Sequence, residues 1–438
     1  MLASTPFTIA LKDLLGGRFR VHPRECERFA VAGATPKLVL SPQSIEEAAR
    51  SVKIIAQERA SVVIRGGGTK SLRPPALRDL DAVLDTSELR GILDHKPGDL
   101  TARVAGGTPL SELQFSLRKH GQFFPCDAPF AANATLGGAL AANSNGALRQ
   151  RYGGLRDNVL GMRVALSDGL VAFSGANVVK SVAGYDVHKA FIGSYGTLGV
   201  IGEVVLKVAP MPATERLLVA GFRSLASACA AATAIARSNL FVMATTLHDP
   251  KAAQRAAALR GSSEWTLVVR CGGSRAATTA QFDGAAATCK SGGASAMRDL
   301  DAELVPAAWA DIAELAGGAM YPSERYAVAK LVGLPAQTHL LADAAHAAWP
   351  DAELCAHPSA GVLFANIPIE SAQSQPGELW KQLAAHDWSA SYIAAPAALA
   401  DAWIAPLPAH SPMKLQRRLK AALDKAGIFD PGRYWGGI

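Results

Sequence analysis

A run of three glycines near residue 65 could bind a phosphate group through its backbone. Residues 61–64 are mostly β-branched and predict a short strand, which leads directly into Arg65, Gly66, Gly67, Gly68, Thr69 and Lys70. Successive backbone N–H groups that no side chain covers can form a concave anion site, and Arg65 and Lys70 would add positive charge. Taken alone, the run is explained equally well as a flexible turn.

This glycine run does not fit a Rossmann dinucleotide site. Such a site needs a crossover helix after the glycines and then a strand that ends in an acidic residue about 20 residues on. Asp85 stands at nearly that distance, but residues 72–75 are Leu-Arg-Pro-Pro, and two adjacent prolines are incompatible with a helix interior. We therefore expect the loop to belong to another architecture.

A second glycine-containing segment spans residues 135–146. Thr135 is a good N-cap for a short helix, and Gly146 stands near its expected end. Glycine costs a helix about 1 kcal/mol relative to alanine, so the adjacent pair Gly137 and Gly138 indicates that side chains must be kept away. The helix terminus would then let an anion or a flat ring approach the backbone. The alternative is close packing of the helix on a strand.

A third glycine-rich stretch precedes an apolar strand. It contains Lys180-Ser-Val-Ala-Gly-Tyr-Asp and, after a short predicted helix over residues 186–192, Gly193-Ser-Tyr-Gly-Thr-Leu-Gly-Val-Ile. Glycines at this density indicate that the backbone, and not side chains, faces a flat or anionic group.

The six cysteines and ten histidines form no metal or cluster motif. No Cys-x-x-Cys or His-x-His pair occurs, and the cysteines lie far apart. We therefore expect no metal site and no iron–sulfur cluster within this chain. Electrons that leave a redox cofactor would have to pass to another protein or to a diffusible acceptor.

The composition is that of a large globular protein. The chain has 438 residues, of which 49% are hydrophobic and 18% charged, and its formal charge is +7. This length allows two or three domains with sizeable cores. Nucleic-acid binders concentrate basic residues beside aromatic ones, whereas here the basic residues are scattered and aromatics make up 6%. A cofactor with a pyrophosphate suits the positive charge equally well, so we expect no nucleic-acid partner.

The sequence predicts neither secretion nor membrane insertion. Residues 1–14 lack the basic and apolar regions of a signal peptide, and the longest apolar stretch, residues 225–236, is too short to span a bilayer. We expect a cytoplasmic protein without a direct membrane span, peripheral at the inner membrane only through partner subunits.

Short predicted strands and helices must position the glycine segments. Ser44 is expected to cap a helix that carries Ala48, Val52 and Ile55 on one face. A further helix is predicted over residues 109–120, and strands are predicted over residues 82–84, 101–104, 159–166, 170–173 and 200–208.

The pattern changes at Pro210 and Pro212, which we take as a domain boundary. After it, a helix is predicted over residues 224–237, with strands over residues 216–222, 242–247, 265–270 and 326–332. The predicted units are an N-terminal segment (1–39), a first domain (40–210), a second α+β domain (211–410) and a C-terminal tail (411–438). A basic amphipathic helix is expected to begin the tail and to run from Met413 to Arg433.

In this order and spacing, the three glycine segments resemble the FAD-binding domain of the vanillyl-alcohol oxidase/p-cresol methylhydroxylase superfamily. Residues 180–186 and 193–201 are most similar to the FAD-binding subunits of bacterial glycolate oxidases, and the resemblance covers residues 40–210 and 424–433. It implies an α+β protein in which a PCMH-type FAD-binding domain of two α/β subdomains is followed by an α+β cap domain. The C-terminal tail would return to the FAD-binding domain.

The resemblance also implies which residues bind FAD. The loop from Arg65 to Lys70 would wrap the pyrophosphate. The flavin side would be lined by Thr135, Leu136, Gly137, Gly138, Asn145 and Gly146, and backbone contacts would come from Gly199, Val200 and Ile201. Asp430 stands where many relatives have Asn before Pro-Gly, which leaves open whether the tail contacts the flavin.

We expect FAD to be bound non-covalently. Relatives that attach it through the first glycine loop use a His where this chain has Gly68-Thr69. Relatives that attach it through a cysteine place that residue closer to Gly137 than Cys126 is here. A free, partly buried cysteine is the commoner state.

The predicted second domain offers two candidates for catalysis. Related D-2-hydroxy-acid dehydrogenases position their substrate with a His-rich stretch, and the nearest analogue here is residues 357–364, in which His357 matches and Phe364 replaces the second His. A lone His beside Pro is more often structural than a base. Lys330 alternates with Tyr326 in a predicted strand and could meet a carboxylate, although a surface lysine is the simpler interpretation.

Two functions follow from the resemblance. The first is the FAD-binding subunit of a glycolate oxidase complex, which oxidises glycolate, a 2-hydroxy acid, to glyoxylate and passes electrons to an iron–sulfur subunit beside a sister FAD subunit. The alternative is a stand-alone flavoenzyme that oxidises another hydroxy acid or alcohol, such as D-lactate. A third, non-enzymatic interpretation treats the glycine loops as turns of a nucleic-acid-binding or scaffold protein.

Overall fold

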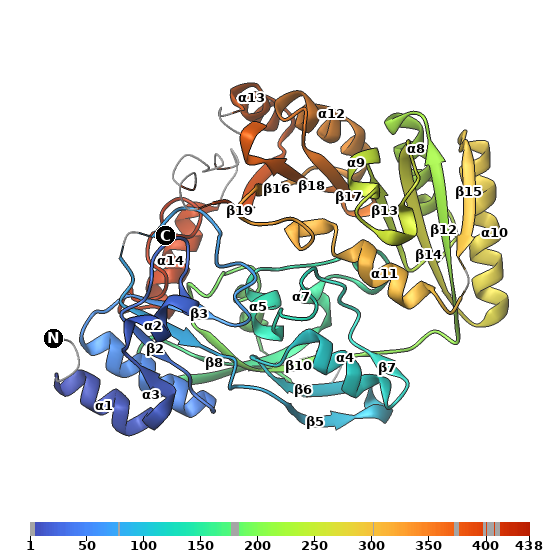
Figure 1. The fold of residues 1–438 in the computed structure, drawn as a ribbon. Helices are drawn as coiled ribbons and strands as arrows, with labels where there is room; N and C mark the ends of the chain where they lie inside the picture. Colours follow the sequence, from blue (N-terminus) through green and yellow to red (C-terminus); the bar gives the residue numbers. More distant parts are fainter. Residues whose placement is uncertain are drawn as a thin grey trace.

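The computed structural model describes residues 5–77, 79–176, 184–300, 302–371, 376–396, 400, 407 and 412–438. Within these ranges the protein has three sheets of four or more strands (Figure 1). Two of them come from the first half of the chain, and the largest comes from the second half. No helix among the described residues has the length and apolar character needed to cross a membrane.

The first sheet leads into the glycine run at residue 65. Its strands are β1 (Phe19–Arg20), β2 (Leu38–Leu40), β4 (Ala82–Asp85) and β3 (Val62–Arg65), in that spatial order. β2, β4 and β3 run parallel. Separate apolar clusters cover the two faces of the sheet, which explains why these strands are continuously apolar.

Helix α3 (Ile45–Gln57) covers one face of this sheet, and α1 (Pro6–Leu15) contacts α3. The predicted cap is confirmed, since Ser44 Oγ accepts a hydrogen bond from Glu47 N at 3.1 Å. Ala48, Val52 and Ile55 are fully buried, as their spacing predicts. α2 (Pro23–Cys26) contributes to the cluster on the other face. Between β3 and β4 the described residues form no helix, which confirms that the site is not a Rossmann site.

The second sheet carries the other two glycine segments. Its strands are β5 (Ile92–Lys96), β6 (Thr101–Ala105), β10 (Val200–Lys207), β8 (Val159–Ala165) and β9 (Val171–Gly175), in that order, and all neighbours are antiparallel. The helices that lie between β6 and β8 in the sequence are α4 (Leu110–Arg118), α5 (Leu136–Ala141), α6 (Arg149–Tyr152) and α7 (Leu155–Asn158). A small ladder of β7 (Gln122–Phe123) and β11 (Ala209–Pro210) ends this half.

Several predicted boundaries in this half are wrong. The helix predicted over residues 135–146 ends at Ala141, because Asn143 adopts a positive φ of 46° and turns the chain. The helix predicted over residues 186–192 is a 3-10 turn, Val187–Ala190. The strand predicted over residues 170–173 begins at Val171 and continues to Gly175.

The third sheet has eight antiparallel strands. In spatial order they are β15 (Ala296–Leu300), β12 (Thr214–Phe222), β14 (Trp265–Gly273), β13 (Ala244–His248), β17 (Glu353–His357), β18 (Val362–Pro368), β16 (Tyr326–Val332) and β19 (Ser389–Ala394). We call this sheet and its helices the cap. The first two sheets and their helices correspond to the domain that the resemblance identifies as FAD-binding, and we call them the FAD-binding half.

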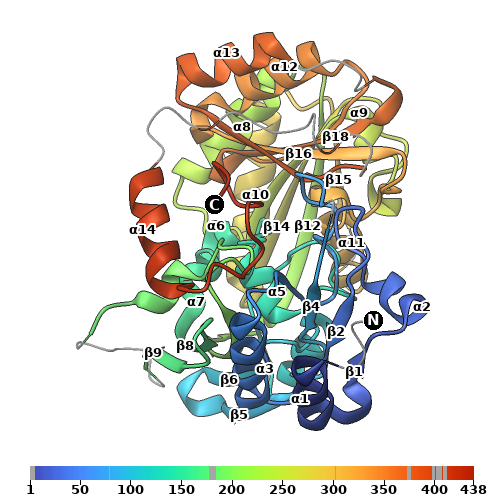
Figure 2. The same cartoon turned by 90° about the vertical axis from the view of Figure 1, so that its left-hand side faces the viewer.

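The two faces of the cap sheet pack against different partners. Helices α8 (Leu225–Arg237), α10 (Arg275–Ser291), α12 (Thr338–Ala348) and α13 (Gly377–His386) share an apolar cluster with one face. The other face packs on α9 (Pro250–Ala253), α11 (Val305–Ala313) and the loop residues Ala147 and Leu148. Because Ala147 and Leu148 directly follow the second glycine segment, this face of the cap sheet lies on the side of the glycine segments (Figure 2).

The C-terminal tail returns to the FAD-binding half, as the resemblance implies. Helix α14 (Met413–Leu423) ends ten residues before Arg433, because Asp424 turns the chain by accepting the backbone N–H groups of Ile428 and Phe429. Val62 N donates to Ile428 O at 2.8 Å, and Asp430 N donates to Val62 O at 2.9 Å. The tail is thereby held against the free edge of β3.

Candidate functional site

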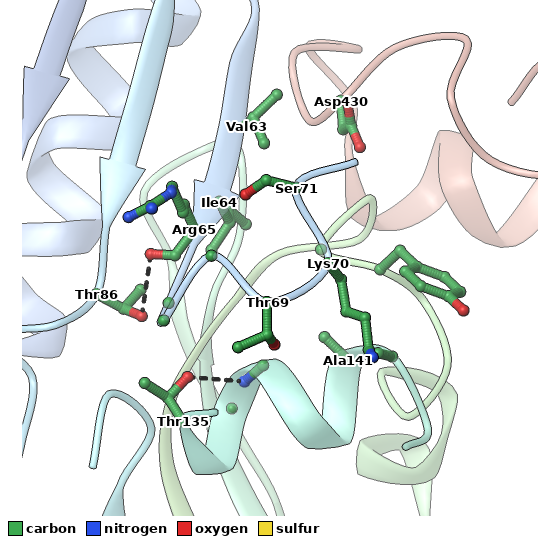
Figure 3. A pocket seen from close by; sticks show the side chains of 18 of the residues that line it. Val63, Ile64, Arg65, Thr69, Lys70, Ser71, Thr86, Thr135, Ala141 and Asp430 are labelled. Atoms are coloured by element: carbon green, nitrogen blue, oxygen red, sulfur yellow. Dashed lines mark hydrogen bonds between the residues drawn. The ribbon is translucent and has the colours of Figure 1, made fainter. Parts of the chain in front are cut away.

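The glycine run after β3 forms one wall of a pocket (Figure 3). Helix α5 forms the facing wall, and the C-terminal tail closes one side. The predicted residues that line it are Arg65, Gly66, Gly67, Gly68, Thr69, Lys70, Thr135, Gly137, Gly138, Gly199 and Ile201. Segments far apart in the sequence therefore meet at one site.

Thr135 begins α5 as predicted. Its Oγ1 accepts a hydrogen bond from Gly138 N at 3.2 Å, and its backbone is extended, as an N-cap requires. Gly137 N donates to Gly106 O at 2.6 Å. The helix is thus anchored at its start on the loop after β6.

Four of the predicted residues lie outside this pocket. Leu136 and Val200 are fully buried in the cores of the FAD-binding half. Asn145 Oδ1 accepts a backbone N–H from α7 at 2.7 Å. A Cβ on Gly146 would lie 1.9 Å from Oδ1 of Asp127, so this glycine is required by packing. A motif read along the sequence does not separate the residues that line a cavity from those that alternate into the core.

The glycines of the pocket are also explained by contacts within the protein. A Cβ on Gly67 would lie 1.7 Å from Asn133 O, and one on Gly137 would lie 2.9 Å from Gly106 O. Both distances are too short for a side chain. Close packing, the alternative raised for the second segment, is therefore part of the reason for these glycines, because the loop and α5 must approach closely to form the pocket.

Twelve further residues that line the pocket were not predicted from the sequence. They are Val31, Val63, Ile64, Ser71, Arg73, Thr86, Ala141, Ala142, Tyr195, Gly196, Asp430 and Arg433. Tyr195 and Gly196 lie inside the third glycine segment and could have been included with it. The tail residues Asp430 and Arg433 line the pocket directly. Residues 177–183 of the third segment lie outside the described residues.

Positive charge dominates the described lining of the pocket. Its charged side chains are Arg65, Lys70, Arg73, Arg433 and the single carboxylate Asp430. Asp430 pairs with Arg433 at 3.2 Å and lies 4.0 Å from Arg73. Burial lowers the pKa of Arg65, and it is the main cause that lowers the pKa of Lys70 to about 8. Partly or fully buried cations in such excess are costly unless an anion joins them.

The pyrophosphate of FAD fits this lining. Arg65 Nε and Arg433 Nε are buried and have no hydrogen-bond partner among the described residues. Unsatisfied buried donors of this kind are rare in folded proteins, and an anionic ligand would satisfy them. The surplus of cations over carboxylates points to the same ligand chemistry.

The two catalytic candidates come together on the cap face that looks toward the pocket. The sheet register pairs Lys330 with Phe364, and Phe364 with Cys355. Directly opposed residues share a face, and Phe364 and Cys355 pack in the cluster that contains Leu148. His357, on β17, packs against Phe364, and the centres of the two rings lie 5.6 Å apart. Lys330 is half-buried, so its interpretation as a surface lysine is wrong.

Arg149 joins these two residues from the FAD-binding half. Burial and then Arg149 lower the pKa of Lys330 to about 8, whereas burial, Lys330 and Arg149 lower the pKa of His357 to about 3. Lys330 also lowers the pKa of Lys70 in the pocket. Within the described part of the chain, none of these four side chains makes a hydrogen bond or an ion pair.

The cap also contacts the loop before α5. The Glu314 carboxylate accepts the backbone N–H groups of Phe130 and Ala131, at 2.7 and 2.9 Å. Lys70 Nζ lies 4.6 Å from the centre of the Phe130 ring. The cap, the pocket and the cationic cluster are therefore adjacent.

Comparisons with known families agree with this organisation. Residues 36–174 match a model described as an FAD binding domain, and residues 211–326 match one described as the C-terminal domain of FAD linked oxidases. These two matches correspond to most of the FAD-binding half and to the first part of the cap.

Several curated proteins are similar to parts of the chain. The glycolate oxidase subunit GlcD of Bacillus subtilis is 32% identical over 193 residues, which are 44% of this chain and 41% of that protein. The glycolate oxidase subunit GlcE of Escherichia coli is 37% identical over 158 residues, 35% of this chain and 44% of that protein. D-lactate dehydrogenase [cytochrome] 1 of Saccharomyces cerevisiae is 30% identical over 217 residues, 49% of this chain and 37% of that protein. The matches span less than half the length of these relatives.

Solved structures share the whole fold. Substrate-bound p-cresol methylhydroxylase superposes with a TM-score of 0.78 over 97% of this chain and 95% of that chain, at 14% identity. An alkyldihydroxyacetonephosphate synthase superposes with a TM-score of 0.71 over 97% and 86%, at 19% identity. The chain thus combines an FAD-binding domain with the C-terminal domain of the FAD-linked oxidases, on the PCMH-type fold.

Proposed function

We propose that this chain is an FAD-dependent oxidoreductase that oxidises the CH–OH group of a small 2-hydroxy acid, with glycolate as the first candidate. The observation that carries the proposal is an excess of cations over carboxylates on two sides of one site. Those of the pocket suit FAD, and Lys330 and Arg149 beside it suit a carboxylate. The similarity to glycolate oxidase subunits and D-lactate dehydrogenases supports the same substrate class.

The chain would bind FAD through the pyrophosphate and through the flavin ring. Arg65, Arg73 and Arg433 would bind the pyrophosphate, and the start of α5 would lie along the ring. Attachment would be non-covalent. Burial raises the pKa of Cys126 to about 12, which keeps its thiol protonated and unreactive. When bound, the flavin would supply the hydride acceptor.

Lys330 and Arg149 would orient the substrate by binding its carboxylate. Among the described residues neither side chain has an anionic partner that the substrate must displace. The two cations come from opposite sides, Lys330 from the cap and Arg149 from the FAD-binding half. A carboxylate bound between them would place the neighbouring hydroxyl group between the cap and the pocket.

His357 would accept the hydroxyl proton. Its pKa of about 3 means that the imidazole is neutral at pH 7 and has a free lone pair. Lys330 and Arg149 are among the causes of that low pKa, so a carboxylate that neutralises them would raise it. In this proposal, substrate binding itself strengthens the base.

Electrons would leave through partner subunits. No group of three or more His, Cys, Asp and Glu side chains able to hold a metal ion occurs among the described residues, and the six cysteines are free. We therefore propose an iron–sulfur subunit as the acceptor and a sister FAD subunit beside this chain, in a cytoplasmic complex that reaches the inner membrane through its partners. The similarity to both GlcD and GlcE supports a multi-subunit assembly.

The first experiment is an absorption spectrum of the purified chain. We expect flavin bands that leave the polypeptide on denaturation, and bleaching of those bands when glycolate is added without oxygen. A protein that takes up no flavin, even after incubation with FAD, would contradict the proposal. Yellow chromophore that stays on the denatured chain would contradict non-covalent binding.

The second candidate is a stand-alone oxidase or dehydrogenase of another hydroxy acid. The 30% identity to a D-lactate dehydrogenase favours D-lactate as its substrate. Turnover of the isolated chain with glycolate and with D-lactate, using an artificial dye as acceptor, separates the two. Fast turnover of D-lactate without any partner would favour the second candidate.

A further inference from the structure

We propose that the ammonium group of Lys70 faces the redox-active ring of the bound FAD and sets its reduction potential, while the arginines of the pocket hold the pyrophosphate. The inference rests on the proposed function, because it needs FAD in the pocket. It assigns Lys70 a role other than the pyrophosphate contact that its place in the glycine loop implies.

The first argument is the direction in which the Arg65 and Lys70 side chains point. Arg65 and Lys70 stand at the two ends of the same loop, and their side chains leave it toward opposite sides (Figure 3). Lys70 extends toward Ala141 near the end of α5, whereas Arg65 extends toward the Thr86 side. A single compact pyrophosphate next to Arg65 would therefore lie away from the Lys70 ammonium.

The second argument is the pairing of the cations. Arg433 donates to Arg73 O at 2.6 Å, and Asp430 pairs with Arg433, so these two arginines form one fixed group with the tail. Lys70 takes no part in that group. Its contact is the face of the Phe130 ring, and it has no hydrogen-bond or ion-pair partner among the described residues. An ammonium held in a pocket against an aromatic ring retains most of its field, because no carboxylate among the described residues forms an ion pair with it.

The third argument is the position of the substrate. A flavin ring must lie where a substrate can meet it, and the cap side of the pocket is the side of Lys70. Lys330 of the cap is close enough to lower the pKa of Lys70, and Glu314 of the cap binds the backbone of Phe130. Val31 and Val63, which also line the pocket, belong to an apolar cluster of the first sheet. The part of the pocket lined by Val31 and Val63 is therefore apolar and suits the adenosine part of FAD.

The physical effect follows from charge. Two-electron reduction places negative charge on the flavin ring, and a fixed cation beside the ring stabilises the reduced form more than the oxidised form. The potential is therefore expected to rise with the Lys70 charge. Glu314 weakens this effect only in part, because two backbone N–H groups already occupy its carboxylate.

The test compares K70M, which removes the charge, with K70R, which keeps it. The control is K381M, an exposed lysine of α13 whose side chain is 78% accessible. Three quantities are measured. The dissociation constant for FAD is measured by adding FAD to the FAD-free protein. The reduction potential against a reference dye and the affinity for sulfite are measured on the FAD-loaded protein. Sulfite forms a reversible S–N bond to N5 of oxidised flavin and leaves negative charge on the ring, so its affinity reports the same field.

We expect K70M to lower the potential and to weaken sulfite binding by about tenfold or more, with FAD affinity changed by less than about threefold. K70R should restore both values, and K381M should change neither. If K70M does not fold, K70Q provides the same charge removal with a polar side chain.

Two results would overturn the inference. One is a K70M protein that loses FAD affinity by more than about tenfold and keeps its potential, which would assign Lys70 to the pyrophosphate. The other is a K70M protein unchanged in all three measurements. Failure of the wild-type chain to bind FAD would instead contradict the proposed function.

Discussion

The indole Nε1 of Trp309, on cap helix α11, donates a hydrogen bond of 3.1 Å to the Asp127 carboxylate of the FAD-binding half. The same carboxylate accepts the backbone N–H of Leu148, the residue before Arg149. Burial is the main cause that raises the pKa of Asp127. One carboxylate thus joins the cap to the loop that carries a proposed substrate-binding cation.

Removing the indole donor should weaken both the fold and the site. In W309F the hydrogen bond to Asp127 is lost and the smaller ring leaves a cavity in the buried cluster, so we expect the free energy of unfolding to fall by about 2 kcal/mol or more. The Michaelis constant for glycolate should rise, because the loop before Arg149 is less firmly held. Denaturation by urea and steady-state kinetics measure the two effects. W265F is the matched control, since the Trp265 indole makes no hydrogen bond among the described residues. Equal behaviour of the two variants would contradict the prediction.

Replacing Asp430 should make the protein depend more strongly on FAD. Asp430 is the only carboxylate among the described lining residues of the pocket, and it pairs with the buried Arg433. In D430N two buried guanidinium groups lose their counter-charge, so we expect the FAD-free protein to lose about 3 kcal/mol of stability. FAD should restore a larger share than in the wild type, because its pyrophosphate replaces the missing charge.

The measurement for D430N is the melting temperature with and without saturating FAD. D168N is the control, because Asp168 forms an exposed pair with Lys425, and such pairs contribute about 0–1 kcal/mol. An FAD-induced shift no larger in D430N than in the wild type would mean that the tail charge and the cofactor are independent.

Local signals explain which elements could be predicted from the sequence. Ser44 and Thr135 each cap a helix with their own side chains, and the cap lies within three residues of its partner. The glycine run after β3 is also a local pattern, but only the resemblance to the FAD-binding superfamily assigns it to the site. Such features depend on neighbours along the chain and survive in any fold that contains them.

The charge arrangement of the site depends on contacts that are distant in sequence. Arg73 and Arg433 exchange hydrogen bonds across 360 positions, and no periodicity relates them. Lys330 looked like a surface residue because alternation along β16 does not say which face the cap sheet buries. Only the register with β18 and the packing against Leu148 decide that it faces the FAD-binding half.

Carboxylate binding should weaken as the pH rises through about 8. Lys70 and Lys330 both have a pKa lowered to about 8, mainly by burial. Lys330 and Arg149 lower these values further, and Glu314 partly offsets the effect on Lys70. Below pH 8 both amines carry the charge that an anion needs, and above it they lose that charge. A lysine with an ordinary pKa would show this change only near pH 10.5.

Oxalate is a suitable probe, because it carries carboxylates but has no hydrogen to transfer. Titrating the FAD-loaded protein with oxalate between about pH 6 and pH 9.5, and following the flavin absorbance, should give a dissociation constant that rises above about pH 8. In K330M the remaining pH dependence should be smaller. A dissociation constant that stays constant to the end of this range would show that Lys330 does not hold the anion.

Replacing His357 should reduce turnover without removing the cofactor. In H357Q the side chain keeps a hydrogen-bonding group of similar size but accepts no proton, so we expect kcat to fall by about 100-fold or more. The flavin spectrum and the melting temperature should stay close to those of the wild type. Stopped-flow reduction of the flavin by glycolate isolates this step from electron transfer to a partner.

The neighbouring cations make a second test of His357 possible. Lys330 and Arg149 help to hold its pKa near 3, so K330M should raise that pKa. The acid limb of kcat/KM reports the base of the free enzyme, and it should therefore move to higher pH in K330M. H357Q should lack this limb. If H357Q instead reduces the flavin within about threefold of the wild-type rate, His357 is a structural residue packed on Phe364, and the base must be sought elsewhere in the cap.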